Sequence, residues 1–505
     1  MNTDFGKLEN KYSLGTGSVA EYYTKVDEKK YFATLAALSS DGYEKKEEKN
    51  IAENCFTVFT NGDEDIYASY YTGIKEAVLV REPHGKYLEF CDTPRGVRVK
   101  PLMTQLDLCD FGESVVFRLP DARFIIFDGG REFMPDADKL FACLKEQSGE
   151  DKPTVAAWIL THPHIDHYRG AVCALEKYGD SINVQTFIYS FPDGTEEECA
   201  RILRLEKEKM GLSRLESLVK KSGADVIKAH TGQVFDIGGA HLELLFTPDD
   251  TRDETVESIN AMSLVVKMTI AGQSIMMCAD CMLPYARLAE KFGSYLKCDI
   301  LQPAHHMFIG GDIPTYRLID PETVVVPSFE DDVFGRISPY QDICKKENLY
   351  LFYDLGVSDF FTGSTGNVVL ELPYKPRENG RELYFEKLRE YKRRAGALSW
   401  YFSDVTKEDA TFTFLNTTAE VANVYADLYF DEVKDIVLNI LIKVPPMRTV
   451  YVDLLDPEAA NGDALFFNNH SLLKKGIPDG KPFTVNFKSD IPITVSGKKP
   501  ALYHS

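Results

Sequence analysis

The sequence predicts a three-part α/β chain, in which a central domain of alternating strands and helices lies between two β-rich parts. Apolar runs of strand length alternate with helix-spaced runs through residues 99–375. Short β-like runs separated by turn residues fill residues 1–98 and most of residues 376–505. A chain of 505 residues, 44% of them hydrophobic, can build about three domains of ordinary size.

Residues 1–98 are expected to form a small β-rich module. Its strand-like runs are Tyr31–Leu35, Cys55–Phe59 and Glu76–Val80. Turn signals between some of them are Asp41-Gly42 and Asn61-Gly62. The charged run Glu44–Lys49 is interpreted as a solvated loop.

The most informative stretch of the central domain is the H-x-H-x-D-H pattern of residues 162–167, directly after an apolar run. It holds three of the ten histidines of the chain and one carboxylate, and these side chains are ligands for zinc, iron and manganese. Side chains of an extended segment alternate between two faces, so His162 and His164 can hold one ion. Asp166 and His167 follow the start of a turn and can reach a second ion.

This pattern resembles the signature of the metallo-β-lactamase fold superfamily, whose members are metal-dependent hydrolases built as αββα sandwiches. Further motifs of the superfamily follow apolar runs in the expected order, as Asp128-Gly129-Gly130, Asp280 and His305-His306. The resemblance covers residues 100 to 370 and is greatest to the hydrolase-like domains of bacterial DNA-uptake channel proteins and their soluble relatives. It implies that Asp128 orients the ligand loop, that Asp280 bridges two metals, and that His305 is the last histidine ligand.

Two details of the ligand set stay open. Neighbouring residues of a strand face opposite ways, so His306 competes with His305, and the resemblance favours His305. Most dinuclear members also supply a third histidine after a Thr-Pro-Gly turn, where this chain reads Thr247-Pro248-Asp249-Asp250. Either Asp249 or Asp250 supplies a carboxylate there, or the first site is weak and the protein holds one tight metal.

His230 and His241 are the only histidines between the motif and His305. His230 precedes a turn and is interpreted as a surface residue. His241 lies in an alternating run and is interpreted as a half-buried strand residue.

The ligand set expected from the resemblance is His162, His164, Asp166, His167, Asp280 and His305, with two divalent ions, zinc first and manganese or iron as alternatives. Two cations about 3.5–4 Å apart hold a water and lower its pKa toward 7. Asp166 is expected to be catalytic, because it can orient this nucleophile as well as bind metal. The expected reaction is hydrolysis of an ester-type bond.

A phosphodiester or another phosphoester is the favoured substrate, and Arg169 beside the motif favours an anionic one. The alternatives are a lactone, thioester or amide hydrolase of the same fold, which needs one metal and one donor for the oxyanion. A further alternative is a non-catalytic metal-binding or scaffold protein, which the missing third histidine would suit.

The charge balance of the chain limits which molecules it can bind. The net charge of -21 disfavours a broad nucleic-acid-binding face but allows a small phosphoester substrate. The ten cysteines show no paired spacing and indicate reduced thiols; Cys278 and Cys281 are small buried hydrophobes or neighbours of the metal pocket. A polar start and the lack of a long apolar run lead us to expect a cytoplasmic protein without a membrane segment.

The remaining elements follow from periodicity. In the central domain, helices are predicted over 137–147, 169–178 and, as one or two helices, 195–222. The amphipathic run 381–394 predicts a helix whose basic end, Lys392-Arg393-Arg394, caps it or, less plausibly, forms a nucleic-acid arm. A β-sandwich of the immunoglobulin-like kind is predicted from 411–414, 421–430, 436–444, 449–454 and 483–487, with turns at Pro445-Pro446, Asn461-Gly462 and Asp479-Gly480.

Overall fold

A computed structural model provides the structure of the chain. It describes residues 4–504 except 16, 110–111, 203–204, 252–255, 257, 308–309, 335–347, 364–365, 396–398, 417–420, 431–436, 455–481, 492 and 500–502. The chain divides into two compact units, residues 1–333 with 348–384 and residues 334–347 with 385–505. The turns expected at Asn461-Gly462 and Asp479-Gly480 lie outside the described residues, as do the side chains of Lys392-Arg393-Arg394.

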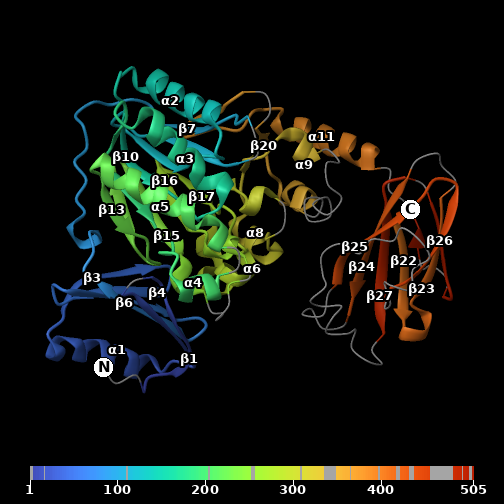
Figure 1. Cartoon of the computed structure of the whole chain (residues 1–505), viewed down its shortest axis with the longest axis horizontal. Coiled ribbons are helices and arrows are strands. Elements are labelled where there is room, and N and C mark those ends of the chain that lie inside the picture. Colours follow the sequence, from blue (N-terminus) through green and yellow to red (C-terminus); the bar gives the residue numbers. More distant parts are fainter. Residues whose placement is uncertain are drawn as a thin grey trace. The chain divides into compact units, whose positions relative to one another are not determined.

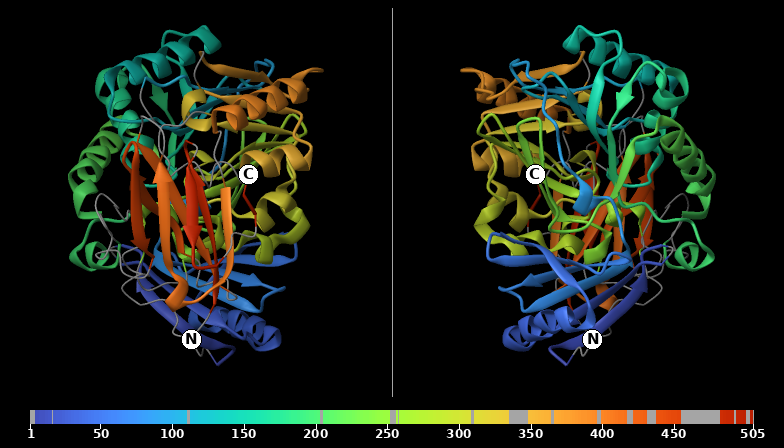
Figure 2. Two further views of the ribbon diagram at one scale, coloured as in Figure 1. Left: turned by 90° about the vertical axis from the view of Figure 1, so that its right-hand side faces the viewer. Right: turned by 90° about the vertical axis from the view of Figure 1, so that its left-hand side faces the viewer.

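The first unit begins with a six-stranded antiparallel sheet in the order β1-β2-β6-β5-β4-β3. Its strands are β1 (Lys7–Ser13), β2 (Val19–Thr24), β3 (Glu44–Ile51), β4 (Asn54–Thr60), β5 (Glu64–Tyr71) and β6 (Glu76–Pro83). The helix α1 (Glu28–Ala37) and the 3-10 turn η1 (Leu38–Asp41) cover one face of the sheet, as Figure 1 and Figure 2 show. The opposite face contacts the rest of the unit.

Two predictions for this module are wrong. Tyr31–Leu35 lies in α1, where Tyr31 and Leu35 are buried four residues apart, a spacing that suits one helix face as well as a short strand. The side chain of Asp27 caps this helix by accepting a hydrogen bond from the backbone N–H of Lys30 at 3.0 Å. The charged run Glu44–Lys49 is the edge strand β3, which pairs with β4 and keeps its charged side chains toward solvent.

Two mixed sheets form the rest of this unit. The first has the order β13-β12-β10-β9-β8-β7-β21, with β11 beside β10. Its strands are β7 (Leu102–Gln105), β8 (Ser114–Arg118), β9 (Phe124–Asp128), β10 (Thr154–Ile159), β11 (Asn183–Val184), β12 (Thr186–Tyr189), β13 (Asp225–Lys228) and β21 (Val368–Glu371). The second runs in the order β14 (Val234–Ile237), β15 (Ala240–Phe246), β16 (Val265–Ile270), β17 (Gln273–Met277), β18 (Ile300–Gln302), β19 (Thr323–Val326) and β20 (Asp359–Thr362).

Helices follow the strands of both sheets. The helices α2 (Met134–Ser148), α3 (Ile165–Tyr178) and α5 (Leu205–Ser222) pack on the first sheet around the buried indole of Trp158, and α4 (Glu196–Arg201) precedes α5. The second sheet is accompanied by α6 (Leu283–Ala286), α7 (Leu288–Phe292), α8 (Ile313–Ile319) and α9 (Glu330–Phe334). The helices predicted over 137–147, 169–178 and 195–222 are therefore confirmed. Among the described residues, no helix combines the length and apolarity needed to span a membrane.

Short 3-10 turns join several of these elements. They are η2 (Tyr87–Glu89), η3 (Pro248–Asp250), η4 (Ile259–Met262), η5 (Gly293–Leu296) and η6 (Ala304–Met307). Three of them, η3, η4 and η6, take part in the contacts described below.

The two mixed sheets are built alike. In each, antiparallel strands come first and a parallel set follows, β9-β10-β12-β13 in one sheet and β17-β18-β19-β20 in the other. Ligand sites in α/β sheets favour the carboxyl ends of parallel strands. The motif residues come directly after β9, β10, β17 and β18, so each sheet supplies two adjacent strand ends to one site.

The second unit contains α11 (Gly380–Ala395), most of which belongs to it, and two antiparallel sheets with one apolar core. The larger sheet has the order β25 (Val437–Val444), β24 (Ala422–Tyr429), β27 (Phe483–Ser489), β22 (Ser399–Val405) and β29 (Tyr503–His504). The smaller sheet has the order β26 (Arg448–Asp453), β23 (Thr411–Asn416) and β28 (Thr494–Gly497), and a 3-10 turn, η7 (Lys407–Asp409), precedes β23. The predicted strands of this region are thus confirmed wherever the structure describes them.

Candidate metal centre

The H-x-H-x-D-H residues occupy the loop between β10 and α3 and the first turn of that helix. His162 is fully buried in the loop, and His164 takes the position just before the helix with extended backbone angles. Asp166 and His167 lie in the first turn of α3, where the positive end of the helix dipole favours a carboxylate. The turn expected after His164 is therefore the start of a helix.

A close backbone crossing holds this helix against the end of β9. The N–H of Gly129 donates to the carbonyl of His167 at 2.7 Å, and the N–H of Gly170 donates to the carbonyl of Gly130 at 2.7 Å. A Cβ on Gly170 would lie 1.9 Å from the carbonyl oxygen of Gly129. The Asp-Gly-Gly motif and the glycine after the histidine motif therefore form one contact that positions His167.

We expect Gly170→Ala to disrupt this crossing. The added methyl group must displace α3 or β9, and overpacking of this kind costs about 1–3 kcal/mol of unfolding free energy. Because His167 moves with the helix, the variant should also bind less metal. Chemical denaturation and elemental analysis would measure both effects. Gly96→Ala is the control for the loss of a glycine, since its Cβ would meet open space and its backbone is not left-handed. Equal metal content in wild type and Gly170→Ala would contradict the expectation.

Asp128 fixes the orientation of His167. Its Oδ1 accepts the backbone N–H of Thr161 at 2.8 Å, and its Oδ2 accepts the Thr161 hydroxyl at 2.6 Å. The Nδ1 of His167 lies 2.8 Å from the same Oδ2, so that ring nitrogen carries the proton and donates it to the carboxylate. The Nε2 lone pair of His167 consequently points away from Asp128 into the cluster, as a metal-ligating histidine requires.

Asp280 lies at the centre of the cluster, and its two carboxylate oxygens face different histidines. Its Oδ1 is 3.2 Å from Nε2 of His167 and 3.4 Å from Nε2 of His306. Its Oδ2 is 3.8 Å from Nε2 of His162 and 3.6 Å from Nε2 of His305. The side chain is only 1% exposed, so these imidazoles rather than solvent surround the carboxylate.

Two groups of potential ligand atoms overlap at this carboxylate. His162, His164 and Asp280 offer three atoms within 4.8 Å of one another. Asp166, His167, Asp280 and His306 offer four atoms within the same distance. The described residues therefore include a His/Asp cluster in which two groups of possible metal ligands share Asp280.

The histidine pair after β18 differs from the strand geometry that the sequence suggested. His305 and His306 have φ of 51°, and Met307 has φ of 65°, so the chain makes a left-handed turn instead of continuing extended. In such a turn successive side chains are not on opposite faces, so both imidazoles approach Asp280. Only His306 belongs to the four-atom group, while His305, the one favoured from sequence, contacts Oδ2. Consecutive left-handed non-glycine residues cost roughly 1–2 kcal/mol each and are typical of functional sites.

His306 has a fixed ring orientation. Its Nδ1 donates to the carbonyl of Pro327 at 2.7 Å, which leaves the Nε2 lone pair directed at Asp166 and Asp280. His167 and His306 are thus prepared in the same way, one by a carboxylate and the other by a backbone carbonyl.

The electrostatics of the cluster suit metal ligation. Burial lowers the pKa of His162 well below its usual value, so this imidazole is neutral and offers a lone pair. Burial alone would raise the pKa of Asp280, but His167, His306 and His305 lower it well below its ordinary range. Nε2 of His162, Nδ1 of His164, Nε2 of His167 and both Asp280 oxygens are buried without a hydrogen-bond partner among the described residues. Buried polar atoms that converge in this way fit divalent cations.

Asp249 and Asp250 do not join the cluster in the structure. Asp249 accepts a contact from Nδ1 of His230 at 2.8 Å, and Asp250 binds the Tyr71 hydroxyl and lies 3.4 Å from Nζ of Lys291. His230 is fully buried, so its interpretation as a surface residue is wrong. The turn that carries a histidine in the resembled superfamily therefore contacts the N-terminal module here.

Arg169 is engaged on the surface of α3. Its Nη1 lies 2.8 Å from Glu132 and its Nη2 lies 3.1 Å from Glu208. These ion pairs occupy the guanidinium, so its placement does not favour the expected contact with an anionic substrate. Cys278 and Cys281 are buried thiols outside both ligand groups, and burial raises the pKa of each.

Glu113 and Gln302 hold the backbone beside the metal ligands in place. Neither residue belongs to a motif that the sequence reveals. Gln302 Oε1 accepts the backbone N–H groups of Cys278 at 2.8 Å and Ala279 at 2.7 Å, which fixes the turn before Asp280. Its Nε2 donates to the buried carboxylate of Glu113 at 3.2 Å. Burial raises the pKa of Glu113 to about 8, against the opposing effect of His167. The role of these two residues can be recognised only in the folded structure, in which β8, β17 and β18 lie close together.

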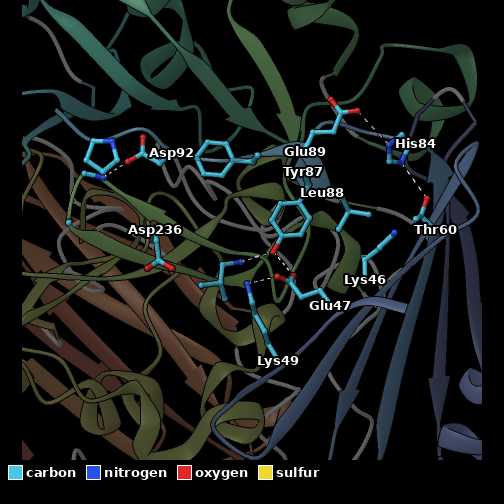
Figure 3. Close-up of a pocket in the computed structure, with 15 residues that line it drawn as sticks. Lys46, Glu47, Lys49, Thr60, His84, Tyr87, Leu88, Glu89, Asp92 and Asp236 are labelled. Carbon is cyan, nitrogen blue, oxygen red and sulfur yellow. Dashed lines mark hydrogen bonds and ion pairs between the residues drawn. The ribbon is translucent and has the colours of Figure 1, made fainter. Parts of the chain in front are cut away.

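A separate cavity of about 790 Å³ lies between the N-terminal sheet, the segment after it and the strand β14. Figure 3 shows Tyr87 directed at Glu47 within it and His84 directed at Thr60. Nζ of Lys49 lies 2.5 Å from a carboxylate oxygen of Glu47, so these two opposite charges form an ion pair within the cavity. No residue of the metal cluster lines this cavity.

Neither a family model nor a curated protein matches the chain. Among solved structures, the short form of human tRNase Z is 12% identical with a TM-score of 0.26, over 45% of this chain and 90% of that one. A Parabacteroides distasonis protein described as a metal-dependent hydrolase is 13% identical with a TM-score of 0.26, over 63% and 98%. The Anabaena sensory rhodopsin transducer is 25% identical with a TM-score of 0.16, over 20% and 96%. Similarities at these TM-scores assign neither fold nor function, so the chemistry of the site rests on its side chains.

Proposed function

We propose that the protein is a metal-dependent hydrolase of an ester-type bond that works with two divalent cations, zinc in the first place. The observation that carries this proposal is the position of Asp280, whose two oxygens each face a different pair of histidines. A carboxylate in this position can bridge two cations and set their separation.

Each cation would have its own set of ligands. His162, His164 and Oδ2 of Asp280 would hold the first, and His305 would complete this set in place of the histidine that the superfamily supplies after its Thr-Pro-Gly turn. Asp166, His167, His306 and Oδ1 of Asp280 would hold the second. Imidazole-rich sets of this kind suit zinc, and manganese or iron remain the alternatives.

When bound, such a pair of cations lowers the pKa of water to about 7 and polarises the scissile group. The residues of the chain position the reactants. Asp166 Oδ2 lies 3.5 Å from His306 and 4.0 Å from His167, and Oδ1 lies 3.8 Å from Nδ1 of His164. From this position the carboxylate would accept a hydrogen bond from the attacking water and orient it. Asp128 and the Pro327 carbonyl keep two imidazoles in the ligating tautomer.

A phosphoester is the proposed substrate class, supported by the resemblance of the sequence motifs and by the two-cation geometry, which suits in-line displacement at phosphorus. A lactone, thioester or amide is the alternative, since one cation and one donor serve an acyl oxyanion. The buried, mutually oriented ligands argue against a scaffold that binds no metal, because an empty cluster would retain the cost of burying these polar atoms.

The test combines metal analysis with a substrate screen. Protein purified without chelator should contain two divalent ions per chain, and His305→Ala should contain about one, because it removes one ligand of the first set only. His241→Ala is the matched control, since this exposed histidine pairs with Asp236 away from the cluster. Bis(4-nitrophenyl) phosphate, 4-nitrophenyl acetate and a homoserine lactone would be offered in parallel. Hydrolysis of the acyl substrates alone would favour the alternative, and two ions without any hydrolysis would favour a binding role.

A further inference from the structure

The buried amide of Asn260 contacts the imidazole of His305 at the edge of the metal cluster. Asn260 lies in η4 and is 4% exposed, and its Nδ2 is 3.1 Å from Nε2 of His305. Its Oδ1 is buried and has no hydrogen-bond partner among the described residues. The main interaction of this amide is therefore with a ring nitrogen of the cluster.

The backbones on both sides of this contact are fixed. The N–H of His305 donates to the carbonyl of Ala279 at 2.7 Å. Directly after η4, the N–H of Leu264 donates at 3.0 Å to the carbonyl of Thr161, in the loop that carries the first histidines of the motif. The position of the amide relative to the ring is thus set by the same strand ends that set the metal ligands.

The contact differs from those that orient the other imidazoles. His167 and His306 are each held through Nδ1, which leaves the Nε2 lone pair available. The amide of Asn260 donates instead to Nε2 of His305, the nitrogen that faces Asp280. An unprotonated ring nitrogen has one lone pair, so it accepts the amide hydrogen bond or ligates a cation, but not both.

Ligation by His305 therefore releases the amide of Asn260. The released amide would keep neither its acceptor at Nδ2 nor a partner at Oδ1, and a buried polar group without partners is costly. The amide would lie beside the ligated imidazole, where an oxygen atom of a bound substrate can accept the N–H.

Solvent reaches the cluster on the side of this contact. The side chains of His164 and His305 are 29% and 15% exposed, whereas the other three histidines of the cluster are fully buried. Both exposed imidazoles belong to the proposed first set of ligands. A substrate therefore approaches the centre from the side on which Asn260 contacts His305.

We propose that Asn260 is an oxyanion donor of the active site, whose Nδ2 leaves His305 when the metal centre is loaded and donates a hydrogen bond to a phosphoryl oxygen of the substrate. A donor of this kind stabilises the charge that develops on that oxygen in the transition state. This inference rests on the proposed function for the loaded first set and for the phosphoester substrate. It adds a catalytic residue outside the ligand set.

Metal affinity separates this role from a structural one. Asn260→Ala should hold both cations at least as tightly as wild type, because loss of the amide ends its competition for Nε2 of His305. Competition with a chromogenic chelator would measure this. Asn183→Ala is the matched control, since that exposed amide donates to the Thr154 hydroxyl at 3.3 Å, away from the cluster. Weaker metal binding by Asn260→Ala would show that the amide only orients the imidazole, and would overturn the inference.

Binding of inorganic phosphate to the metal-loaded protein tests the donor without turnover. By isothermal titration calorimetry, Asn260→Ala should bind phosphate about 10-fold to 100-fold more weakly than wild type, the loss expected for a hydrogen bond to a charged group. Asn183→Ala should bind it like wild type. Asn260→Asp keeps the size of the side chain but offers no N–H and adds a like charge, so it should bind phosphate more weakly still. Wild-type affinity in either Asn260 variant, or no phosphate binding by wild type, would overturn the inference.

A rate comparison links the donor to the reaction. With bis(4-nitrophenyl) phosphate, Asn260→Ala should lower kcat about 100-fold to 1000-fold, as the loss of an oxyanion donor does, with a smaller change in KM. A wild-type kcat in this variant would reject the catalytic role. Fewer than two ions in wild type, or no hydrolysis by it, would reject the proposed function instead, and the phosphate comparison would still decide the role of Asn260.

Discussion

Asp280→Asn is expected to remove both metal ions and abolish hydrolysis. The amide keeps the size of the side chain but replaces one of the two oxygens that face the histidine pairs, and it removes the charge that the cations need. Loss of an outer-shell partner alone typically costs 10-fold to 100-fold in affinity or activity, so loss of the shared ligand should exceed about 100-fold. Elemental analysis and initial rates on the substrate found in the screen would measure this.

The control for this variant is Asp236→Asn. Asp236 is exposed on β14 and pairs with His241, so its neutralisation changes charge without touching the cluster. A circular dichroism spectrum of Asp280→Asn that matches wild type would show that the fold remains. Full metal content together with wild-type rates in Asp280→Asn would reject the bridging role and the two-cation proposal with it.

The stability of the protein is expected to fall as the pH rises from about 6.5 to 9, through the buried group around His230. Burial lowers the pKa of this imidazole, but Asp249 and Glu82, each 2.8 Å from one ring nitrogen, raise it to about 9. Lys228 lies 3.3 Å from the same Glu82, and the Tyr67 ring stacks on the imidazole at 4.0 Å. Protonated His230 therefore ties the N-terminal module to the turn η3.

The sign follows from the direction of each pKa change. The folded pKa of His230 is raised, so its contribution is complete below the unfolded value near 6.5 and is lost as the pH passes 9. Burial raises the pKa of Glu82, but His230 and Lys228 lower it to about 2, so its contribution is present above about 4.5 and is lost toward pH 2. Both groups stabilise the fold between these limits, His230 by about 3 kcal/mol.

His230→Gln should cost about 3–5 kcal/mol of unfolding free energy at pH 6, because it leaves Glu82 and Asp249 buried without their cation. The difference from wild type should shrink at pH 9. Urea denaturation at pH 6, 7.5 and 9 would measure it, with His241→Gln as the exposed-histidine control. A constant difference between variant and wild type at all three pH values would contradict the charged state assigned to His230.

These contacts occupy the turn at which the sequence differs from the superfamily that it resembles. Where the resembled proteins have a histidine after Thr-Pro-Gly, Asp249 and Asp250 face His230, Tyr71 and Lys291. In this chain the turn contacts the N-terminal module through Tyr71 and also packs against His230. The left-handed turn after β18 brings a second histidine to Asp280, which offers a replacement ligand from another strand end.

The sequence by itself determined what depends on neighbours along the chain. The H-x-H-x-D-H pattern after an apolar run, the Asp-Gly-Gly motif and Asp280 are local, because strand ends and helix starts are encoded by adjacent residues. Local sequence patterns also predicted correctly the described strands of the second unit and most helices of the first. They gave the wrong structure for Tyr31–Leu35 and Glu44–Lys49, because these short runs fit two structures equally well and packing against a sheet decided between them.

Tertiary structure alone decided the partners of side chains that are distant in sequence. His230 looked exposed because its turn is polar, but Glu82 of β6 and Asp249 of η3 surround it. The roles of Glu113 and Gln302 exist only where three strands meet. Charge and burial at such positions are long-range properties, since they are set by elements that approach one another only when the chain has folded.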